Sequence, residues 1–377
     1  MFCPQFRPIV GGAERQAEKL ARALAGIGWS VRILTPRMDP DSPSREEAAG
    51  VSIERFPYVD LASRYHVPGI GALNVPYILW QTARAVRPSL AGASVLHCHL
   101  ASLQTVGAAL AGRAARIPVL CKAATAGERS DLGQIEATGR SGRFVAWLAR
   151  MSIGTWVATT AAVADALVRA GMLRSRIVRI PNGVEPAPPA VAARRGGGAR
   201  RFLSMGRVSV NAARDLPTLV QAFDALAGDH PDVELAIVGG GDLLASTRDL
   251  AAACASRDRI LLPGFDDPAK WLAWADCFVL PSRREGLSNA LLEAMSAGLP
   301  CIANDIAPNR ETLDDGVAGV LVPVGDAGAL EAALRAMADD PALAARFGAQ
   351  ARARVERCYT IGAVAARYAQ LYAGLAA

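Results

Sequence analysis

Closely spaced cysteines are absent from this sequence. Its seven cysteines lie far apart, no CxxC pair occurs and their number is odd. Together these features argue against a disulfide framework or a zinc site and indicate scattered buried thiols in a reducing compartment. No signal peptide is visible either, because the opening Met-Phe-Cys-Pro is too short an apolar run. We therefore expect a cytoplasmic protein without a metal site.

Aromatic residues are also scarce, at 6% of the chain. They do not form the stacking platform among basic residues that nucleic acid requires, so nucleic acid is not an expected partner. The first half is nevertheless basic: residues 1–190 carry 22 Lys and Arg against 13 Asp and Glu, whereas residues 191–377 carry 19 against 22. This balance suits an anionic membrane surface, a phosphate-bearing substrate or general solubility.

Long hydrophobic runs are rare, and one stretch, 144–164, nearly reaches the length that spans a bilayer. Arg150 and Gly154 fall near its middle. A buried helix that leads into a strand over 155–160 explains the same composition, and we prefer this interpretation to a membrane span.

The length of 377 residues is sufficient for two domains with separate cores. Short apolar runs alternate with amphipathic segments, which is typical of parallel sheets covered by helices on both faces. The predicted fold class is therefore α/β, with two doubly wound, Rossmann-like domains. The expected strands are 31–34, 51–56, 95–98, 119–121, 156–159 and 177–180, followed by 201–205, 234–238, 260–262, 277–280, 300–303 and 319–322.

The domain boundary is predicted from residues 183–199, whose three prolines and Gly196-Gly197-Gly198 run do not hold regular structure. We expect a first domain over 1–185, a linker over 186–199, a second domain over 200–360 and a helix over 361–377 that crosses back to the first domain. Only three residues precede Pro4. The first strand is therefore expected to be truncated, either because the real start lies upstream or because it is a shortened sheet edge.

The most informative segment, residues 280–303, reads LPSRREGLSNALLEAMSAGLPCIA. Its apolar run ends at Pro281 and Ser282, and Glu285 precedes a helix expected from about 289 to 297. Amide groups at such a helix start attract a phosphate. The carboxylates of Glu285 and Glu293 can accept hydrogen bonds from flanking hydroxyls. This segment predicts a pocket for a nucleotide sugar.

Further candidates follow other strands of the second half, because open parallel sheets bind ligands at the carboxyl ends of their strands. Arg207 and Arg214 can neutralise a diphosphate without a metal or another cofactor. Gly241 closes a three-glycine loop that lacks the last glycine of a dinucleotide fingerprint, since Leu244 stands there, and this argues against a dehydrogenase. Phe265 follows the next strand.

The first half offers two candidate groups. Gly11 and Gly12 open a helix expected over 13–26, and paired glycines let a backbone approach a phosphate, although a plain tight turn needs only one. His97 and His99 alternate along a strand end and therefore point the same way. They either contact an acceptor, act as a base or pack in the core.

Together these residues resemble the retaining glycosyltransferases of family four, also called glycosyl transferases group 1. The resemblance covers nearly the whole chain. The matching segments are GGAERQAEKLARALAGIGWSVRILT at 11–35, VLHCH at 95–99, IVRIPNGVE at 177–185, FLSMGRV at 202–208, LAIVGGGDL at 235–243, the two acids at 285 and 293, and NRETLDDGVAGVLVPVGD at 309–326. The family has the GT-B fold, in which two Rossmann-like domains face each other across a cleft.

The resemblance implies that the second domain binds a nucleoside diphosphate sugar. Glu285 would hold sugar hydroxyls, Glu293 the ribose and Arg207 the diphosphate. The remaining residues implied at the donor are Gly12, Arg214, Gly241, Phe265, Gly286, Leu287, Ser288 and Asn289.

Two positions depart from the family. Ala212 stands where a lysine is usual, and Arg214, in a longer loop, is the available substitute. A histidine is usual shortly after the strand at 119–121, and Lys122 lies in that region instead. His99 and Lys122 thereby join Glu285 and Arg207 as the candidates for catalysis.

The sequence thus predicts transfer of a hexosyl unit from a nucleoside diphosphate sugar, with retention at the anomeric carbon. The acceptor is expected to be a glycan, a lipid-linked or a small molecule in envelope polysaccharide biosynthesis. The basic first half would contact the inner face of an anionic membrane peripherally. A nucleotide-sugar epimerase or hydrolase of the same architecture and a non-catalytic donor-binding subunit are the alternatives.

Overall fold

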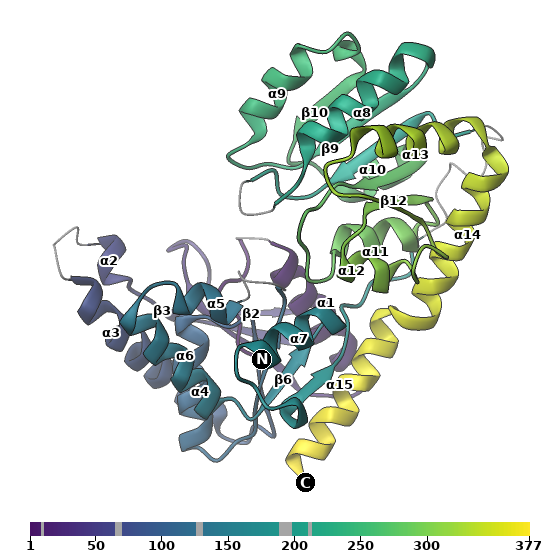
Figure 1. Cartoon of the computed structure of the whole chain (residues 1–377). Coiled ribbons are helices and arrows are strands. Elements are labelled where there is room, and N and C mark those ends of the chain that lie inside the picture. Colours follow the sequence, from purple (N-terminus) through teal and green to yellow (C-terminus); the bar gives the residue numbers. More distant parts are fainter. Residues whose placement is uncertain (9–10, 65–69, 126–130, 188–197, 210–212) are drawn as a thin grey trace. The chain divides into compact units, whose positions relative to one another are not determined.

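The computed structural model describes residues 1–8, 11–64, 70–125, 131–187, 198–209 and 213–377. The chain forms two compact units. Unit 1 comprises Met1–Gly183 and Ile361–Ala377, and unit 2 comprises Val184–Thr360 (Figure 1). Most of the predicted linker, and Ala212, lie outside the described residues.

Unit 2 is built on one parallel sheet in the order β10-β9-β8-β11-β12-β13. Its strands are β8 (Arg201–Met205), β9 (Glu234–Val238), β10 (Ile260–Gly264), β11 (Cys277–Leu280), β12 (Cys301–Asn304) and β13 (Val320–Val322). All six predicted strands are confirmed to within two residues at each end, because each is an apolar run bounded by turn residues. This order, with the first strand of the unit in the middle, is that of a dinucleotide-binding domain.

Helices cover both faces of this sheet (Figure 1). One face packs on Phe223, Leu226 and Leu334, and the other packs on Leu291 and Met295. The helices are α8 (Leu216–Asp229), α9 (Leu244–Ala252), α10 (Pro268–Trp274), α11 (Asn289–Ser296), α12 (Ala307–Thr312), α13 (Ala327–Asp339) and α14 (Pro341–Cys358), with a 3-10 turn η5 (Arg257–Arg259).

Unit 1 contains strands in the orders β1-β3-β2 and β4-β5-β6-β7. They are β1 (Val31–Arg37), β2 (Arg45–Ala48), β3 (Val51–Pro57), β4 (Leu96–His99), β5 (Val119–Ala123), β6 (Thr155–Ala158) and β7 (Ile177–Arg179). All pairs are parallel except β2 with β3. β2 was not predicted, because its sequence REEA has no apolar alternation and it is held at the edge by backbone pairing.

The start of the chain joins these two sets of strands, which corrects the expectation of a shortened sheet edge. Phe2 bridges Leu34 of β1 and Cys98 of β4, in parallel with both. Its N–H donates to the carbonyl of His97 at 2.7 Å, and its carbonyl accepts from His99 N–H at 2.9 Å. The first segment is therefore short but central. Apart from the antiparallel β2 and the last strand β7, unit 1 thereby repeats the strand order of unit 2, with β1 and β3 on one side of Phe2 and β4 on the other.

The helices of unit 1 also form two layers (Figure 1). α3, α4 and α6 pack around Val106 and Trp156, whereas α1 and α15 pack on the opposite face around Leu24 and Tyr368. The elements are α1 (Gly12–Gly26), α2 (Leu61–Arg64), α3 (Ile70–Val86), η1 (Arg87–Leu90), α4 (Leu103–Ala114), α5 (Asp131–Glu136), α6 (Arg140–Ser152), α7 (Ala161–Arg169), η2 (Arg174–Arg176) and α15 (Ile361–Ala376).

The apolar stretch at 144–164 is divided between the end of α6, strand β6 and the start of α7. Within the described ranges, no helix is long and apolar enough to cross a bilayer. The stretch is therefore a helix that leads into a buried strand, as we preferred from its composition.

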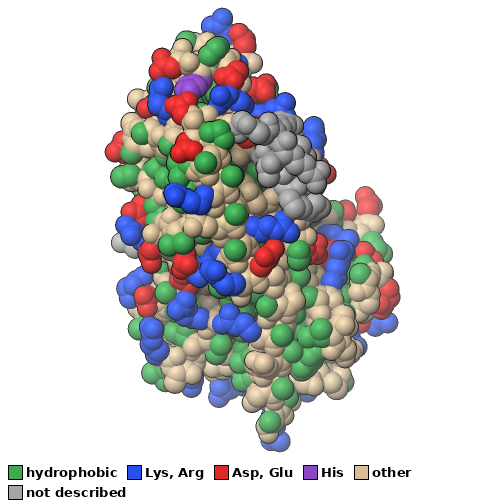
Figure 2. All heavy atoms as spheres, turned by 90° about the vertical axis from the view of Figure 1, so that its right-hand side faces the viewer, with side chains coloured by type: hydrophobic (Ala, Val, Ile, Leu, Met, Phe, Trp, Pro, Cys, Tyr) green, Lys and Arg blue, Asp and Glu red, His purple; other side chains and the backbone are tan. Residues whose placement is uncertain are grey.

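The molecular surface on the α14 side carries basic and acidic side chains intermingled (Figure 2). α14 contributes ion pairs such as Arg352 with Glu356 at 3.0 Å and Arg354 with Asp314 at 3.2 Å. Charge on this side is thus largely balanced locally.

Candidate functional site

Unit 2 places most of its predicted donor residues at the carboxyl ends of two neighbouring strands, β8 and β11. The chain leaves β8 toward β9 and leaves β11 toward β12, in opposite directions. Open parallel sheets bind ligands at such a switch point. The loops after the two strands are joined, because Arg214 forms an antiparallel bridge with Ser282 and Asp215 N–H donates to the carbonyl of Pro281 at 2.6 Å.

Three polar side chains come together there. Ser282 is fully buried, and its Oγ donates to Oε1 of Glu285 at 2.8 Å. Burial raises the pKa of Glu285, while the nearby Arg214 charge and the Ser282 hydrogen bond oppose that shift. Burial likewise lowers the pKa of Arg214, and Glu285 opposes it. The guanidinium is held at the site, yet its buried Nη1 has no hydrogen-bond partner within the described structure.

Gly206, at the end of β8, makes room for this guanidinium. A Cβ at that position would lie 2.2 Å from Nη2 of Arg214, and the glycine has φ +132°. Any other residue would therefore displace the guanidinium and strain the backbone. Arg207, the neighbour, is exposed. Of the two predicted arginines, Arg214 is the one the fold fixes at the switch point.

The three-glycine loop after β9 has a structural cause. A Cβ on Gly239 would lie 1.9 Å from the carbonyl oxygen of Gly206, and a Cβ on Gly241 would lie 2.1 Å from that of Val208. Val208 N–H donates to the carbonyl of Gly240 at 3.0 Å. These glycines let two loops touch along their backbones, which explains them without a dinucleotide fingerprint. The exposed backbone of Gly241 lies on the same edge of the sheet.

Phe265 follows β10 at this edge and is 74% exposed. Its Cβ lies 3.9 Å from a Cβ built on Gly240, so the residue stands next to the glycine loop. An aromatic side chain this exposed contributes little to the core and presents an apolar face to solvent.

The segment from Gly286 to Glu293 surrounds the start of α11. Gly286, Leu287 and Ser288 are buried, and Asn289 is the first helical residue. Ser288 caps the helix by accepting from Leu291 N–H at 3.4 Å. Glu293 follows one turn later and is half-buried. The helix start and its two flanking acids therefore occupy one end of the sheet, as the sequence predicted.

In unit 1 the predicted histidines are buried. The rings of His97 and His99 stack with centroids 4.2 Å apart, which confirms that they point the same way. Nδ1 of His97 and the hydroxyl of Tyr372, on α15, are 2.6 Å apart. Burial, followed by the charges of His99 and Lys122, holds the pKa of His97 well below its usual value. His97 is thus a packed residue, and His99 lies closer to the strand end.

Lys122 lies on β5 in register with His99 and is buried. Burial lowers the pKa of Lys122 to about 7, and burial together with the Lys122 charge lowers the pKa of His99. Nε2 of His99 is buried without a hydrogen-bond partner in the described residues. A lysine and a histidine therefore share the carboxyl ends of β4 and β5. Gly12 begins α1 in the same unit and is exposed.

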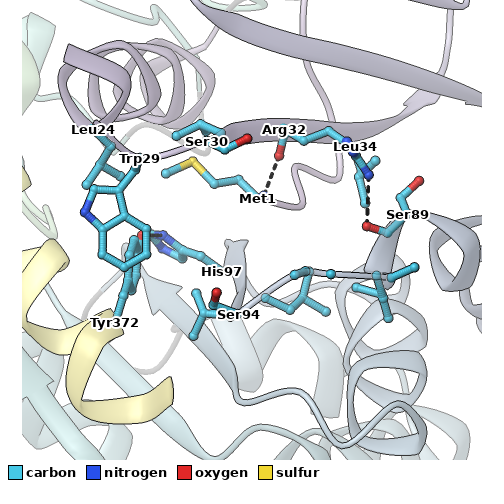
Figure 3. A pocket seen from close by; sticks show the side chains of 17 residues that line it. Met1, Leu24, Trp29, Ser30, Arg32, Leu34, Ser89, Ser94, His97 and Tyr372 are labelled. Atoms are coloured by element: carbon cyan, nitrogen blue, oxygen red, sulfur yellow. Dashed lines mark hydrogen bonds between the residues drawn. The ribbon is translucent and has the colours of Figure 1, made fainter. Parts of the chain in front are cut away.

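A cavity of about 230 Å³ lies at the opposite, amino ends of β1 and β4 (Figure 3). Trp29, Ser94, His97 and Tyr372 line it, and Nη1 of the adjoining Arg32 donates to the carbonyl of Ser89 at 3.1 Å. Because parallel sheets bind ligands at their carboxyl ends, this cavity is separate from the candidate site.

Sequence reasoning missed two of the supporting side chains. Ser282 orients Glu285, and Tyr372 holds His97 from a helix 275 positions away in sequence. Ser282 sits three residues before Glu285 at a strand end, and this spacing was the one available signal. In the part of the chain that the structure describes, no three His, Cys, Asp or Glu side chains cluster as metal ligands would.

Two Rossmann-like units, one of them with an arginine, a serine and a glutamate at its switch point, define a glycosyltransferase of the GT-B class. The chain belongs to glycosyltransferase family four. The family described as Glycosyl transferases group 1 matches residues 193–354, and the Glycosyl transferase 4-like domain matches residues 11–183. The predictions of family and fold are confirmed.

Individual proteins support this assignment over the whole length. A phosphatidyl-myo-inositol mannosyltransferase of Mycolicibacterium smegmatis is 31% identical, with 99% of this chain and 92% of that protein covered. A glycogen synthase of Mycobacterium tuberculosis is 27% identical, with 98% and 92% covered. The structure of sucrose-phosphate synthase from Thermosynechococcus elongatus superposes with a TM-score of 0.75 at 23% identity, with 97% and 94% covered.

Proposed function

We propose that this glycosyltransferase moves a hexosyl unit from a nucleoside diphosphate sugar to an acceptor, with retention at the anomeric carbon. The observation that carries the proposal is the group formed by Arg214, Ser282 and Glu285 at the switch point of unit 2. Two relatives are named for mannosyl transfer and glycogen synthesis, and a structure of similar fold, HepE of Anabaena, was solved with UDP-glucose. These names support a hexosyl donor.

The diphosphate is proposed to bind between Arg214 and the start of α11. A guanidinium offers two parallel donors to phosphate oxygens, and the helix start adds amide groups and a favourable dipole. Arg214 thereby supplies the cation that the family usually draws from a lysine. Arg207 adds an exposed positive charge next to it. On this proposal the diphosphate needs no metal or other cofactor.

The two rings of the donor are proposed to lie on either side of the diphosphate. One oxygen of Glu285 accepts from Ser282, and its other oxygen can accept from a sugar hydroxyl. Glu293 would hold the ribose hydroxyls, and the exposed ring of Phe265 offers a stacking face to the base. Leu287 and Asn289 would shape the sugar pocket, with Gly241 and Gly12 contributing close backbone approaches.

The reaction follows from this placement of charge. The bond from the anomeric carbon to the diphosphate oxygen breaks, and the guanidinium and amide donors stabilise the charge that develops on the leaving group. The acceptor hydroxyl attacks on the face that the diphosphate leaves, which retains the configuration. Its proton passes to the departing diphosphate oxygen on that same face.

The acceptor is proposed to bind in unit 1, where Lys122 and His99 occupy the carboxyl ends of β4 and β5. Lys122, whose pKa is about 7, suits a phosphate or another anionic group on a glycan, a lipid-linked or a small-molecule acceptor when it is protonated, and His99 can hydrogen-bond the acceptor. One relative is named as an amylovoran biosynthesis glycosyltransferase of Erwinia amylovora, and this name supports our proposal of envelope polysaccharide assembly. We extend this to peripheral contact with the inner face of an anionic membrane.

Glu285→Gln tests the proposal, because it keeps the shape of the side chain and removes its negative charge. We expect transfer to fall by about two orders of magnitude or more, while thermal unfolding changes little. Nucleoside diphosphate release should be measured for a panel of nucleotide sugars, with and without acceptor. Full activity in the variant would refute the assignment of Glu285. Equal release in the wild-type protein with and without acceptor would instead indicate a hydrolase.

A further inference from the structure

Helix α6 has apolar side chains on two opposite faces. Its inner face is buried against the sheet through Val145 and Ala149. Its outer face presents Phe144, Trp147 and Met151, which are 55%, 51% and 50% exposed. The spacing of three and four residues puts these three side chains in one line along the helix. The Phe144 and Trp147 rings stack with centroids 5.8 Å apart, so they form one continuous apolar surface.

Basic side chains surround this line. Arg140 and Arg143 are exposed on the first turn of α6, and the exposed Arg113 of α4 donates to the carbonyl of Met151 at 2.6 Å. Residues 137–164 contain no Asp or Glu. The acid immediately before them, Glu136, is ion-paired with Arg150. Unlike the α14 side, where arginines pair with acids, this surface has a net positive charge.

A second exposed aromatic lies in the same helix layer. Trp80 of α3 is 59% exposed, and the Arg84 guanidinium lies 5.8 Å from the centre of its ring. α3 packs on α4 and α4 packs on α6, so the three helices lie side by side on one face of the sheet (Figure 1). Aromatic rings next to arginines recur across this layer.

This combination fits the boundary of a lipid bilayer better than a second copy of the chain. Tryptophan, phenylalanine and methionine side chains can enter the region between headgroups and acyl chains, while guanidinium groups pair with anionic headgroups. In a symmetric dimer formed through the same surface, two patches of net positive charge would face each other, because residues 137–164 of each copy contain no Asp or Glu. Such like-charge contacts oppose association.

We propose that α6 docks the protein on an anionic membrane, with Phe144, Trp147 and Met151 inserted at the interface and Arg140 and Arg143 on the headgroups. This surface gives a location to the membrane contact in the proposed function. Vesicle binding needs neither donor nor acceptor. A lack of vesicle binding would therefore not contradict the glycosyl-transfer proposal, and a lack of transfer would not contradict the membrane-docking proposal.

The experiment is flotation of the full chain with phosphatidylcholine vesicles, with or without phosphatidylglycerol, at low and high salt. We expect binding to the anionic vesicles at low salt only. The double variant Phe144→Ser with Trp147→Ser should reduce the partition coefficient about tenfold or more, since it removes the inserted side chains. Arg140→Glu with Arg143→Glu should reduce it as strongly, because charges near the surface are reversed.

Val317→Ser and Arg257→Glu are matched controls, because both positions are exposed and lie in unit 2. We expect them to bind within about twofold of the wild-type protein, since they alter neither the apolar line nor its arginines. The proposal would be overturned if the wild-type protein did not bind anionic vesicles, or if the α6 variants had the same partition coefficient as the wild-type protein. Sedimentation velocity adds a further test. If the wild-type protein is a dimer, and the Phe144 and Trp147 variant is a monomer that still binds vesicles, this surface is a protein interface and the proposal is overturned.

Discussion

Replacement of Arg214 by methionine should damage transfer far more than the same replacement of Arg207. The Arg214 guanidinium is held against Gly206 and near Glu285, with its Nη1 buried and unpaired in the described structure. Arg207 is exposed. A fixed, desolvated donor stabilises the charge on a leaving group, whereas an exposed arginine is screened by water.

The two variants should therefore differ in magnitude. A preorganised donor is worth about 3–4 kcal/mol in the transition state, which predicts a loss of about 10²–10³ in kcat for Arg214→Met. An exposed ion pair is worth up to about 1 kcal/mol, which predicts less than about a sixfold loss for Arg207→Met. Arg214→Lys should fall between them, because it keeps the charge and loses the planar fork.

The assay is nucleoside diphosphate release at saturating donor and acceptor, together with calorimetric titration of UDP and GDP at fixed salt. Thermal unfolding without ligand checks that each variant is folded. Equal losses for the two methionine variants, or normal turnover in Arg214→Met, would refute the reasoning that burial decides between the arginines.

Two further predictions concern Gly206 and Lys122. Gly206→Ala should reproduce the loss of transfer of Arg214→Met and lower the free energy of unfolding by about 1–3 kcal/mol, because its Cβ meets the guanidinium at 2.2 Å and φ is +132°. Gly228→Ala, in a helix with open space around it, should instead raise the free energy of unfolding, measured in urea, by up to about 1 kcal/mol. A lower free energy of unfolding in both alanine variants would contradict the steric argument. Burial lowers the pKa of Lys122 from 10.5 to about 7, so the native protein binds fewer protons than the unfolded chain between these values. The free energy of unfolding should gain up to about 1.4 kcal/mol per pH unit from this group as pH rises above 7, and Lys122→Met should lose that gain. Urea titrations at several pH values measure the slope, and an unchanged slope in the variant would show that Lys122 is not the group responsible.

The strands of unit 2 could be predicted from sequence because each contains a short apolar run, and β8, β9, β11 and β12 are buried along nearly their whole length. β2 could not, since its four residues are polar and pair through the backbone alone with β3. The position of Phe2 between β1 and β4 also could not be predicted from the sequence. Strand order depends on which backbones meet, and three residues carry no pattern that reports it.

Candidate site residues could be chosen from the sequence, and their arrangement only in part. Glu285, Glu293 and both arginines are candidates because of their residue type and their position after strands. Which arginine reaches the switch point depends on the backbone bridge between Arg214 and Ser282, which sequence spacing does not reveal. Gly241, after β9, is a donor residue implied by the family resemblance, although contact between two loops is enough to explain the glycines there.

A crystal structure of this protein with UDP or GDP tests the central claim most directly. We predict that the diphosphate lies at the carboxyl ends of β8 and β11, with Arg214 within hydrogen-bond distance of a phosphate oxygen and Glu293 on the ribose. A diphosphate bound away from Arg214 and the start of α11 would contradict the account.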